Sequence, residues 1–337
     1  MLQVTIDICT KDRYFSTLPL TLMSIANQTL RPKKVIIYDD STDQKDIRDI
    51  ETIRYILQTF DEKGIGWRVL NGRKMGQHWG HQIVQDMAQT PFVLRVDDDC
   101  VLEPNCLEIL CSHMKDGVGA VGGRVAPPGV QKREMPPNLI SNIQSNCQWF
   151  VWDGVKSDNE HLYGGCYLYR RGIQGFETTL SRKAFREETL HTYGLFKKGY
   201  KLIIDPKAIT YHYQSQNGGI RSEKGEKDTQ QQYWHDEMIF QETLREYEGK
   251  KLILLDSGRG DHLVFKMAIL PKLKEKYKEL TLAVCYPDMF EGEKCIGVTE
   301  ELKFLYGDKH NISKYMHDVG HKTELKYAYA AMYGVEI

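Results

Sequence analysis

The feature that most constrains the fold is a repeated pattern in the N-terminal third of the chain. Short apolar segments, typical of buried strands, cover residues 4–9, 35–38, 67–70 and 92–96. Longer segments with apolar residues at helical spacing lie between them, at residues 18–26, 45–60 and 77–88. Strands that alternate with helices predict an α/β fold, with a mostly parallel sheet and helices on both faces.

Each predicted strand is followed directly by a polar cluster. The four clusters are Thr10–Arg13, Asp39–Ser41, Asn71–Gly76 and Asp97–Asp99. In open parallel sheets, ligands bind beyond the carboxyl ends of the strands. The sequence therefore predicts one binding site built from four strand ends.

Composition limits the class of protein. The chain has 337 residues, 41% of them hydrophobic, and a formal net charge of −1, so an overall basic field for nucleic acid is excluded. The eight cysteines form no CxxC pair, which argues against a zinc ribbon and favours reduced thiols. The N-terminus has no signal-peptide pattern, and no apolar run approaches the length of a membrane span. We therefore expect a soluble, cytoplasmic protein.

The pattern changes after the fourth strand. Residues 120–180 are rich in turns and aromatic side chains and predict an antiparallel lid or acceptor region, in which Gly164 and Gly165 would allow close approach of a ligand. Residues 214–231 are polar and predict a loop. Residues 244–250 indicate a boundary, and a strand at 251–255 restarts the βα pattern. We expect a catalytic domain over residues 1–245 and a small α/β domain over residues 251–337.

Three adjacent carboxylates, Asp97, Asp98 and Asp99, follow a buried strand and precede a predicted helix. Adjacent carboxylates repel one another unless a cation or basic groups lie among them. Magnesium and manganese prefer such oxygen ligands, with substrate phosphates completing the coordination shell. The alternative is an acidic cluster on a solvated loop.

Five segments in order make the chain resemble a family 2 glycosyltransferase with the GT-A fold. They read ICTKDR, LMSIANQTLRPKKVIIYDDSTD, NGRKMGQHWGHQIVQDMA, FVLRVDDDCVLEPN and KKGYKLIIDPKAITYHY, and together they cover about residues 3–213. The resemblance implies a GT-A, Rossmann-like sheet and an inverting transfer of sugar from a nucleoside diphosphate to an acceptor hydroxyl. It also implies dependence on Mn²⁺ or Mg²⁺.

The resemblance further implies roles for residues in the nucleotide site. Asp39 falls where the family places a carboxylate against the base, and a carboxylate can accept the imide N–H of uracil. Asp40 would support it or contact ribose, although both could instead belong to a helix N-cap. The other implied nucleotide contacts are Thr10, Arg13, Arg73, Lys74, Asp97 and Asp98. The implied metal ligands are Asp97, Asp99 and His212.

The catalytic base is implied by an acidic pair that precedes the Gly-Tyr-Lys turn. Counting back from Gly199 places Glu187 and Glu188 on that pair, with Glu188 where the family has aspartate. The alternative is that both are helix-start acids favoured by the helix dipole. Asp236 and Glu237 are rival candidates for the base.

Other functions stay open at this point. A GT-A protein that binds sugar or nucleotide without turnover is one, and a nucleotidyltransferase is disfavoured because CTKDRY is not a GxGxR loop. The acceptor class also stays open among a glycan, a small molecule, a protein and a modified base in nucleic acid, with a lipid-linked sugar less favoured because no membrane anchor is predicted. Residues 251–288 resemble the start of a heptosyltransferase-type GT-B domain, but residues 251–337 are too short for two Rossmann domains. We interpret them as a truncated Rossmann-like unit for packing, homo-oligomer assembly or acceptor docking.

Overall fold

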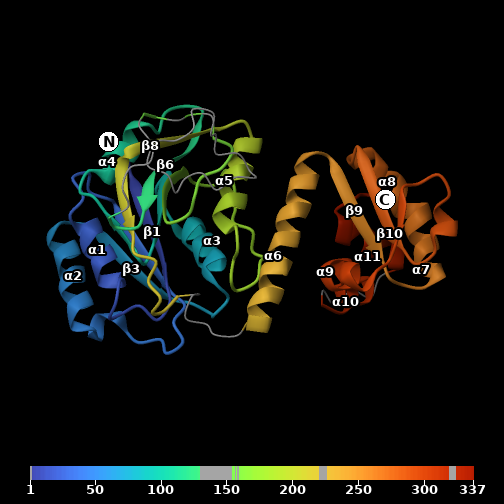
Figure 1. Cartoon of the computed structure of the whole chain (residues 1–337), viewed down its shortest axis with the longest axis horizontal. Coiled ribbons are helices and arrows are strands. Elements are labelled where there is room, and N and C mark those ends of the chain that lie inside the picture. Colours follow the sequence, from blue (N-terminus) through green and yellow to red (C-terminus); the bar gives the residue numbers. More distant parts are fainter. Residues whose placement is uncertain (1, 130–153, 156, 158, 220–225, 319–323) are drawn as a thin grey trace. The chain divides into compact units, whose positions relative to one another are not determined.

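The computed structural model divides into two compact units, residues 1–236 and 237–337 (Figure 1). It describes residues 2–129, 154, 155, 157, 159–219, 226–318 and 324–337. The first unit is built around one eight-stranded sheet, and the second contains a sheet of three strands.

The large sheet has the strand order β3-β2-β1-β4-β7-β6-β8-β5. Strands β1 to β4 run parallel, as the sequence predicts, and β7 pairs antiparallel with both β4 and β6. Strand β8 is parallel to β6 and antiparallel to β5. The strands are β1 (Val4–Thr10), β2 (Lys34–Asp39), β3 (Gly66–Asn71), β4 (Phe92–Asp97), β5 (Cys100–Leu102), β6 (Val118–Ala126), β7 (Cys166–Arg170) and β8 (Lys201–His212).

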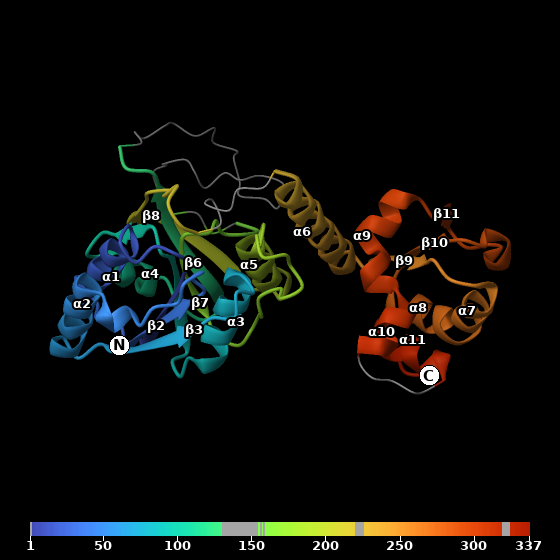
Figure 2. The ribbon, with the colours of Figure 1, turned by 90° about the horizontal axis from the view of Figure 1, so that it is seen from below.

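Helices cover both faces of this sheet (Figure 2). One face carries α1 (Leu18–Ala26), α2 (Glu51–Glu62) and α4 (Cys106–Ser112), with the short 3-10 turn η1 (Ile47–Asp49) before α2. The other face carries α3 (Gln77–Met87) and α5 (Glu187–Lys197). The α/β fold with helices on both faces is therefore confirmed.

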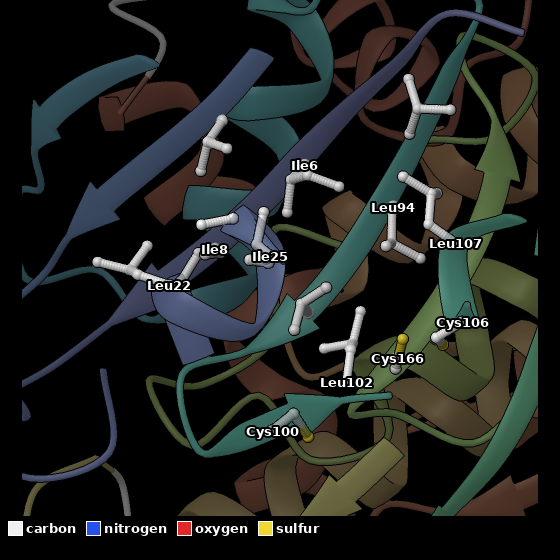
Figure 3. Packing of buried hydrophobic residues seen from close by; sticks show 14 of the residues in the cluster. Ile6, Ile8, Leu22, Ile25, Leu94, Cys100, Leu102, Cys106, Leu107 and Cys166 are labelled. Atoms are coloured by element: carbon white, nitrogen blue, oxygen red, sulfur yellow. The ribbon is translucent and has the colours of Figure 1, made fainter. Parts of the chain in front are cut away.

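Side chains alternate between the two faces along each strand. In β1, Ile6 and Ile8 enter the large core shared with α1, α2 and α4, and Leu94 of β4 joins them (Figure 3). The intervening residues of β1 and β4 face α3 and α5 instead. These residues include Asp7 and Arg95, so the alternation places charged groups inside the second face.

Several elements differ in detail from the predicted ones. The segment expected to be one helix over 45–60 is η1 followed by α2. A short strand, β5, lies between the aspartate triplet and α4. Helix α6 (Glu226–Tyr247) begins at Glu226, within the range 214–231 that was expected to be a loop. The aromatic residues at 149, 150 and 152 lie outside the described residues.

The second unit is a small α/β structure with a parallel sheet in the order β11-β10-β9. Its strands are β9 (Lys250–Leu255), β10 (Glu279–Val284) and β11 (Cys295–Gly297). Its helices are α7 (Arg259–Val264), η4 (Phe265–Ile269), α8 (Leu270–Lys276), η5 (Pro287–Phe290), α9 (Glu300–His310), α10 (Ile312–Asp318) and α11 (Leu325–Tyr333). Among the helices that the structure describes in both units, none has the length and apolar character needed to cross a bilayer.

Gly123 marks an irregularity in the pairing of β6 with β8. The register jumps from Gly123 opposite Asp205 to Arg124 opposite Ile209. A Cβ atom on Gly123 would lie 2.1 Å from the carbonyl oxygen of Ala208. The neighbouring Gly122 has room, because its nearest contact would be a methyl of Leu162 at 3.6 Å.

We expect Gly123→Ala to destabilise the protein by about 3 kcal/mol, because the added methyl meets backbone that must shift. Gly122→Ala is the matched control on the same strand, and it should change stability by less than about 1 kcal/mol. Urea unfolding followed by circular dichroism measures both. Equal effects of the two substitutions would contradict the close approach of β6 to Ala208.

Candidate active site

The carboxyl ends of β1, β2 and β4 bring the predicted polar clusters together. The register places Cys9 beside Asp97 and Thr10 beside Asp39. A cavity of about 510 Å³ opens beside these strand ends. Its lining includes several predicted residues: Arg13, Asp97, Asp98, Asp99, Glu188 and His212.

The three aspartates have different partners. Asp98 accepts a hydrogen bond from the Thr10 hydroxyl at 2.8 Å and lies 3.0 Å from the Arg13 guanidinium. Asp99 lies 2.6 Å from Arg13 and 3.2 Å from His212 Nε2. Asp97 is the most exposed of the three, and its Oδ1 lies 3.1 Å from Arg95. The cationic side chains offset the repulsion that three adjacent carboxylates would otherwise suffer.

The same environment moves the pKa values of the two buried aspartates, Asp98 and Asp99, in opposite directions. Burial raises the pKa of Asp98 to about 7, although Arg13 acts in the opposite direction. Burial also acts to raise the pKa of Asp99, but the hydrogen bond to His212 and the charges of His212 and Arg13 lower it below the usual value. Asp99 is therefore ionised at neutral pH, as a metal ligand must be.

The residues present fit a divalent cation. Ligand atoms of Asp97, Asp99, Cys100 and His212 all lie within 4.8 Å of one another. Carboxylate oxygen and imidazole nitrogen suit Mn²⁺, whereas the thiol of Cys100 is a soft donor and its pKa is raised well above the usual value by burial. Asp97, Asp99 and His212 are accordingly the set that could hold the ion.

Asp39 and Asp40 are buried and do not line this cavity. Asp39 is fully buried, where it accepts hydrogen bonds from the Tyr14 hydroxyl and from the amide of Ser41 at 3.1 Å. Asp40 accepts from the amides of Lys74 and Gly76, at 2.5 and 3.0 Å. Asp40 thus fixes the loop after β3, and the Asp39 carboxylate is held at the end of β2.

The loop after β3 borders a second and larger cavity of about 940 Å³. Arg73 lines this second cavity together with Trp67 and Trp79, whereas the aspartate triplet does not. Lys74 is exposed and adopts a left-handed backbone conformation, with φ of 59°. We place the chemistry at the smaller cavity, because the ionisable groups converge there.

Glu187 and Glu188 begin α5 but point to different surroundings. Glu187 is fully buried, pairs with Arg95 and accepts a hydrogen bond from Gln77 at 3.4 Å. Glu188 is half-buried and lines the cavity. Burial raises the pKa of both carboxyl groups. A raised pKa brings a carboxylate closer to the working pH, which suits a general base.

Other sequence candidates have structural partners. Asp236 is fully buried and accepts hydrogen bonds from the amides of Ser181 and Phe185, at 2.6 and 2.8 Å. Glu237 accepts a hydrogen bond from Gln241 within α6. Arg170 and Arg171, at the end of β7 and directly after it, donate to backbone carbonyls. None of these four side chains lines the smaller cavity.

Sequence reasoning missed a buried charged network beneath the site, formed by Asp7, His81 and Arg95 with Glu187. The Nδ1 atom of His81 lies 2.8 Å from Asp7, and Arg95 donates to His81 Nε2 at 3.2 Å. The signal was present: Asp7 and Arg95 are charged residues inside the apolar strands VTIDICT and FVLRVD. Almost fully buried charges require partners.

Histidines in the same face of the sheet are held neutral. Burial lowers the pKa of His78 to about 4 and that of His191 to about 3. The His191 ring stacks on Phe176 with centroids 4.1 Å apart, and its Nδ1 lies 3.1 Å from the Tyr167 hydroxyl. Since the unfolded chain binds protons near the ordinary pKa of histidine, it takes up more protons than the folded chain as the pH falls below that value.

We therefore expect the buried histidines to lower the free energy of unfolding as the pH falls from about 6.5 to 3, whereas buried carboxyl groups with raised pKa values, such as Asp98, act in the opposite direction. His191 alone should account for roughly 2 kcal/mol of this loss at about pH 5. In urea unfolding at about pH 7.5 and 5, His191→Gln should lack this destabilisation of roughly 2 kcal/mol at the lower pH when it is compared with the wild type. His317→Gln is the control, because His317 is 89% exposed and should leave the pH effect unchanged. An unchanged pH effect in His191→Gln would show that the ring titrates normally.

Solved structures share this fold. The crystal structure of S. aureus TarS residues 1–349 in complex with UDP matches with a TM-score of 0.50 and 14% identity, over 80% of this chain and 71% of that chain. The same S. aureus protein in complex with UDP-GlcNAc matches with a TM-score of 0.50 and 14% identity, over 98% of this chain and 88% of that chain. No curated protein matches the sequence significantly.

The family model described as glycosyl transferase family 2 matches residues 5–174, which is half of the chain. The match runs from β1 through β7, so it contains the strand ends that carry Thr10, Asp39 and the aspartate triplet. The resemblance carried by the sequence motifs is thereby confirmed, and the chain belongs to glycosyl transferase family 2.

Proposed function

We propose that this protein transfers a sugar from a uridine diphosphate sugar to an acceptor hydroxyl, with inversion at the anomeric carbon. The observation that carries the proposal is the smaller cavity, which is lined by the aspartate triplet, Arg13 and His212 and also by Glu188. Family 2 membership supports the reaction class.

In the proposed donor site, Asp39 receives the base and Asp98 receives the ribose. The Asp39 carboxylate now accepts the Tyr14 hydroxyl and the Ser41 amide. A uracil imide N–H would take the place of one of these donors. Thr10 and Arg13 hold Asp98 in position. Arg73 and Lys74, the implied diphosphate contacts, do not line the smaller cavity, so Arg13 is the proposed positive charge there.

Asp97, Asp99 and His212 would hold Mn²⁺ or Mg²⁺ in this proposal. The ion would offset the negative charge on the departing nucleoside diphosphate. Arg13 lies against Asp98 and Asp99 and adds a second positive charge on the same side of the cavity. These groups together favour the state in which the diphosphate leaves.

Glu188 is the proposed general base. It would accept the proton of the acceptor hydroxyl as that oxygen attacks the anomeric carbon from the face opposite the diphosphate. One displacement of this kind inverts the anomeric centre and needs no covalent enzyme intermediate. Glu187 pairs with Arg95 and is not exposed to the cavity, so we assign proton transfer to Glu188.

We also propose that catalysis belongs to residues 1–245 and that residues 251–337 serve packing, homo-oligomer assembly or acceptor docking. The residues that carry the proposed chemistry all lie in the first compact unit. The chain truncated after residue 245 tests the assignment. It should retain nucleotide binding if the first unit is sufficient.

A thermal-shift panel tests the proposed donor. The folded protein should be stabilised by UDP in the presence of Mn²⁺ and much less by other nucleoside diphosphates, since a ligand that binds only the folded state raises the melting temperature. Release of UDP from UDP-sugars then screens for the sugar. A shift with UDP but no turnover on any sugar would favour a non-catalytic binding protein, and no shift with any nucleotide would remove the donor assignment.

A further inference from the structure

The buried network beneath the cavity connects both halves of the proposed active site. Arg95, on β4, contacts Asp97 and Glu187 through the same terminal nitrogen, at 3.1 Å to Asp97 Oδ1 and in a direct ion pair with Glu187 Oε1. Asp97 is a proposed metal ligand, and Glu187 begins α5 directly before Glu188. One guanidinium group therefore holds both a proposed metal ligand, Asp97, and the first turn of the helix that carries the proposed base, Glu188.

Arg95 is itself held from behind by His81 on α3. Its Nε donates to His81 Nε2 at 3.2 Å, and the Nδ1 of His81 lies 2.8 Å from Asp7 Oδ2 on β1. Because an arginine Nε–H can only donate, His81 Nε2 must be the acceptor. The ring therefore carries its proton on Nδ1 and donates it to Asp7, so the contacts fix a single neutral tautomer.

The Arg95 side chain is packed on all sides, which restricts it to this conformation. Its side chain is 1% exposed and lies 5.7 Å from the centroid of the Tyr167 ring. A Cβ atom on Gly164 would lie 3.2 Å from both Arg95 Nη1 and the Glu188 side chain, so the glycine lets these two side chains approach. Arg95 and Glu188 are consequently neighbours at the wall of the cavity.

The group formed by Asp7, Cys9 and His81 is poorly suited to bind a metal ion. Ligand atoms of Asp7, Cys9 and His81 lie within 4.8 Å of one another. However, His81 Nδ1 donates its proton to Asp7, and Nε2 accepts a hydrogen bond from the Arg95 guanidinium. Neither ring nitrogen is therefore available to a metal ion. A second cation in this buried space would be repelled by Arg95.

We propose that Asp7, His81 and Arg95 are positioning residues, which hold Asp97 and the first turn of α5 in the one arrangement that serves both metal binding and proton transfer. This inference rests on the proposed function for the roles of Asp97 and Glu188. Groups that orient metal ligands in this way typically change metal affinity 10- to 100-fold when they are removed.

Two substitutions of His81 give a matched test. In His81→Gln the amide oxygen can reach the position of Nε2 and still accept from Arg95, whereas in His81→Asn the shorter amide reaches only the position of Nδ1 and can donate to Asp7. Both variants lose the imidazole ring and its packing. A difference between them therefore reports on the contact with Arg95 rather than on the loss of the ring.

The first readout needs no metal. We expect the backbone amide resonances of Asp97 and Glu188 to move from their wild-type positions in His81→Asn and to stay near them in His81→Gln. The second readout is Mn²⁺ binding in the presence of UDP, followed by the electron paramagnetic resonance signal of free Mn²⁺. Binding should weaken at least about 10-fold in His81→Asn and in Arg95→Met, and less than about 3-fold in His81→Gln.

The outcomes separate this inference from the proposed function. Equal amide shifts in both His81 variants, or none at Asp97 and Glu188, would overturn the positioning role. If the wild type binds no Mn²⁺ with UDP while the amide shifts follow the expected pattern, the proposed metal site fails and the positioning role stands. If both His81→Asn and Arg95→Met have reduced melting temperatures but wild-type Mn²⁺ affinity, the network contributes only to stability and does not position the site.

Discussion

Glu188→Gln should lower the rate of UDP release from the UDP-sugar about 1000-fold, because a positioned general base contributes 10²- to 10⁴-fold to such a reaction. The amide keeps the shape of the side chain but cannot take the proton. Water can replace the acceptor in this assay, since its attack on the anomeric carbon also requires a base. UDP binding, followed by thermal shift, should stay within about 3-fold of the wild type.

Glu187→Gln is the matched control, because it makes the same chemical change one residue earlier. Glu187 is buried against Arg95, so its substitution should lower the melting temperature. Its effect on turnover should be about 10-fold, through the position of α5. A 1000-fold loss in Glu187→Gln, together with an active Glu188→Gln, would move the role of base to Glu187.

Asp99→Asn should weaken Mn²⁺-dependent UDP binding by at least about 100-fold, because it removes a negatively charged oxygen from the proposed ion site. Asp99 contacts both His212 and Arg13, so the substitution also removes the carboxylate that brings these two groups together. The measurement is the UDP-induced thermal shift over a range of Mn²⁺ concentrations.

Asp205→Asn provides the control for loss of an aspartate–histidine pair. Asp205 is buried and lies 2.7 Å from His113 Nε2, but it does not line the cavity. We expect this variant to lose stability and to keep the Mn²⁺-dependent response to UDP. A response to UDP that is equally strong with and without Mn²⁺ in the wild type would exclude Asp99 as a metal ligand.

The order of strands and helices in the N-terminal third could be predicted from local sequence. The helix over Leu18–Ala26 has its predicted bounds, and β1, β2, β3 and β4 differ from the predicted strands by one or two residues at their ends. These elements have a clear hydrophobic period and end at polar or glycine-rich turns, which are local signals. The irregular segments gave weaker signals, and the first residues of α6, 226–231, fell within the predicted loop because they are polar.

The site was predictable only as a set of strand ends. Asp97, Asp98, Asp99 and Arg13 converge because parallel strands bring their carboxyl ends to one edge, a consequence of topology that the strand pattern already contains. The difference between Glu187 and Glu188 was not predictable in this way. Adjacent helical residues point in directions about 100° apart, and only the packing of α5 decides which of them reaches the cavity.

The sequence by itself determined the fold class, the family and the chemical types of the candidate groups, because each depends on periodicity, spacing or motif order along the chain. The tertiary structure decided which of those groups are buried and what they contact. Arg95 is the clearest case. In sequence it is one arginine in a strand, and only the packing of α3 and α5 over β4 brings His81, Asp97 and Glu187 within reach of its guanidinium.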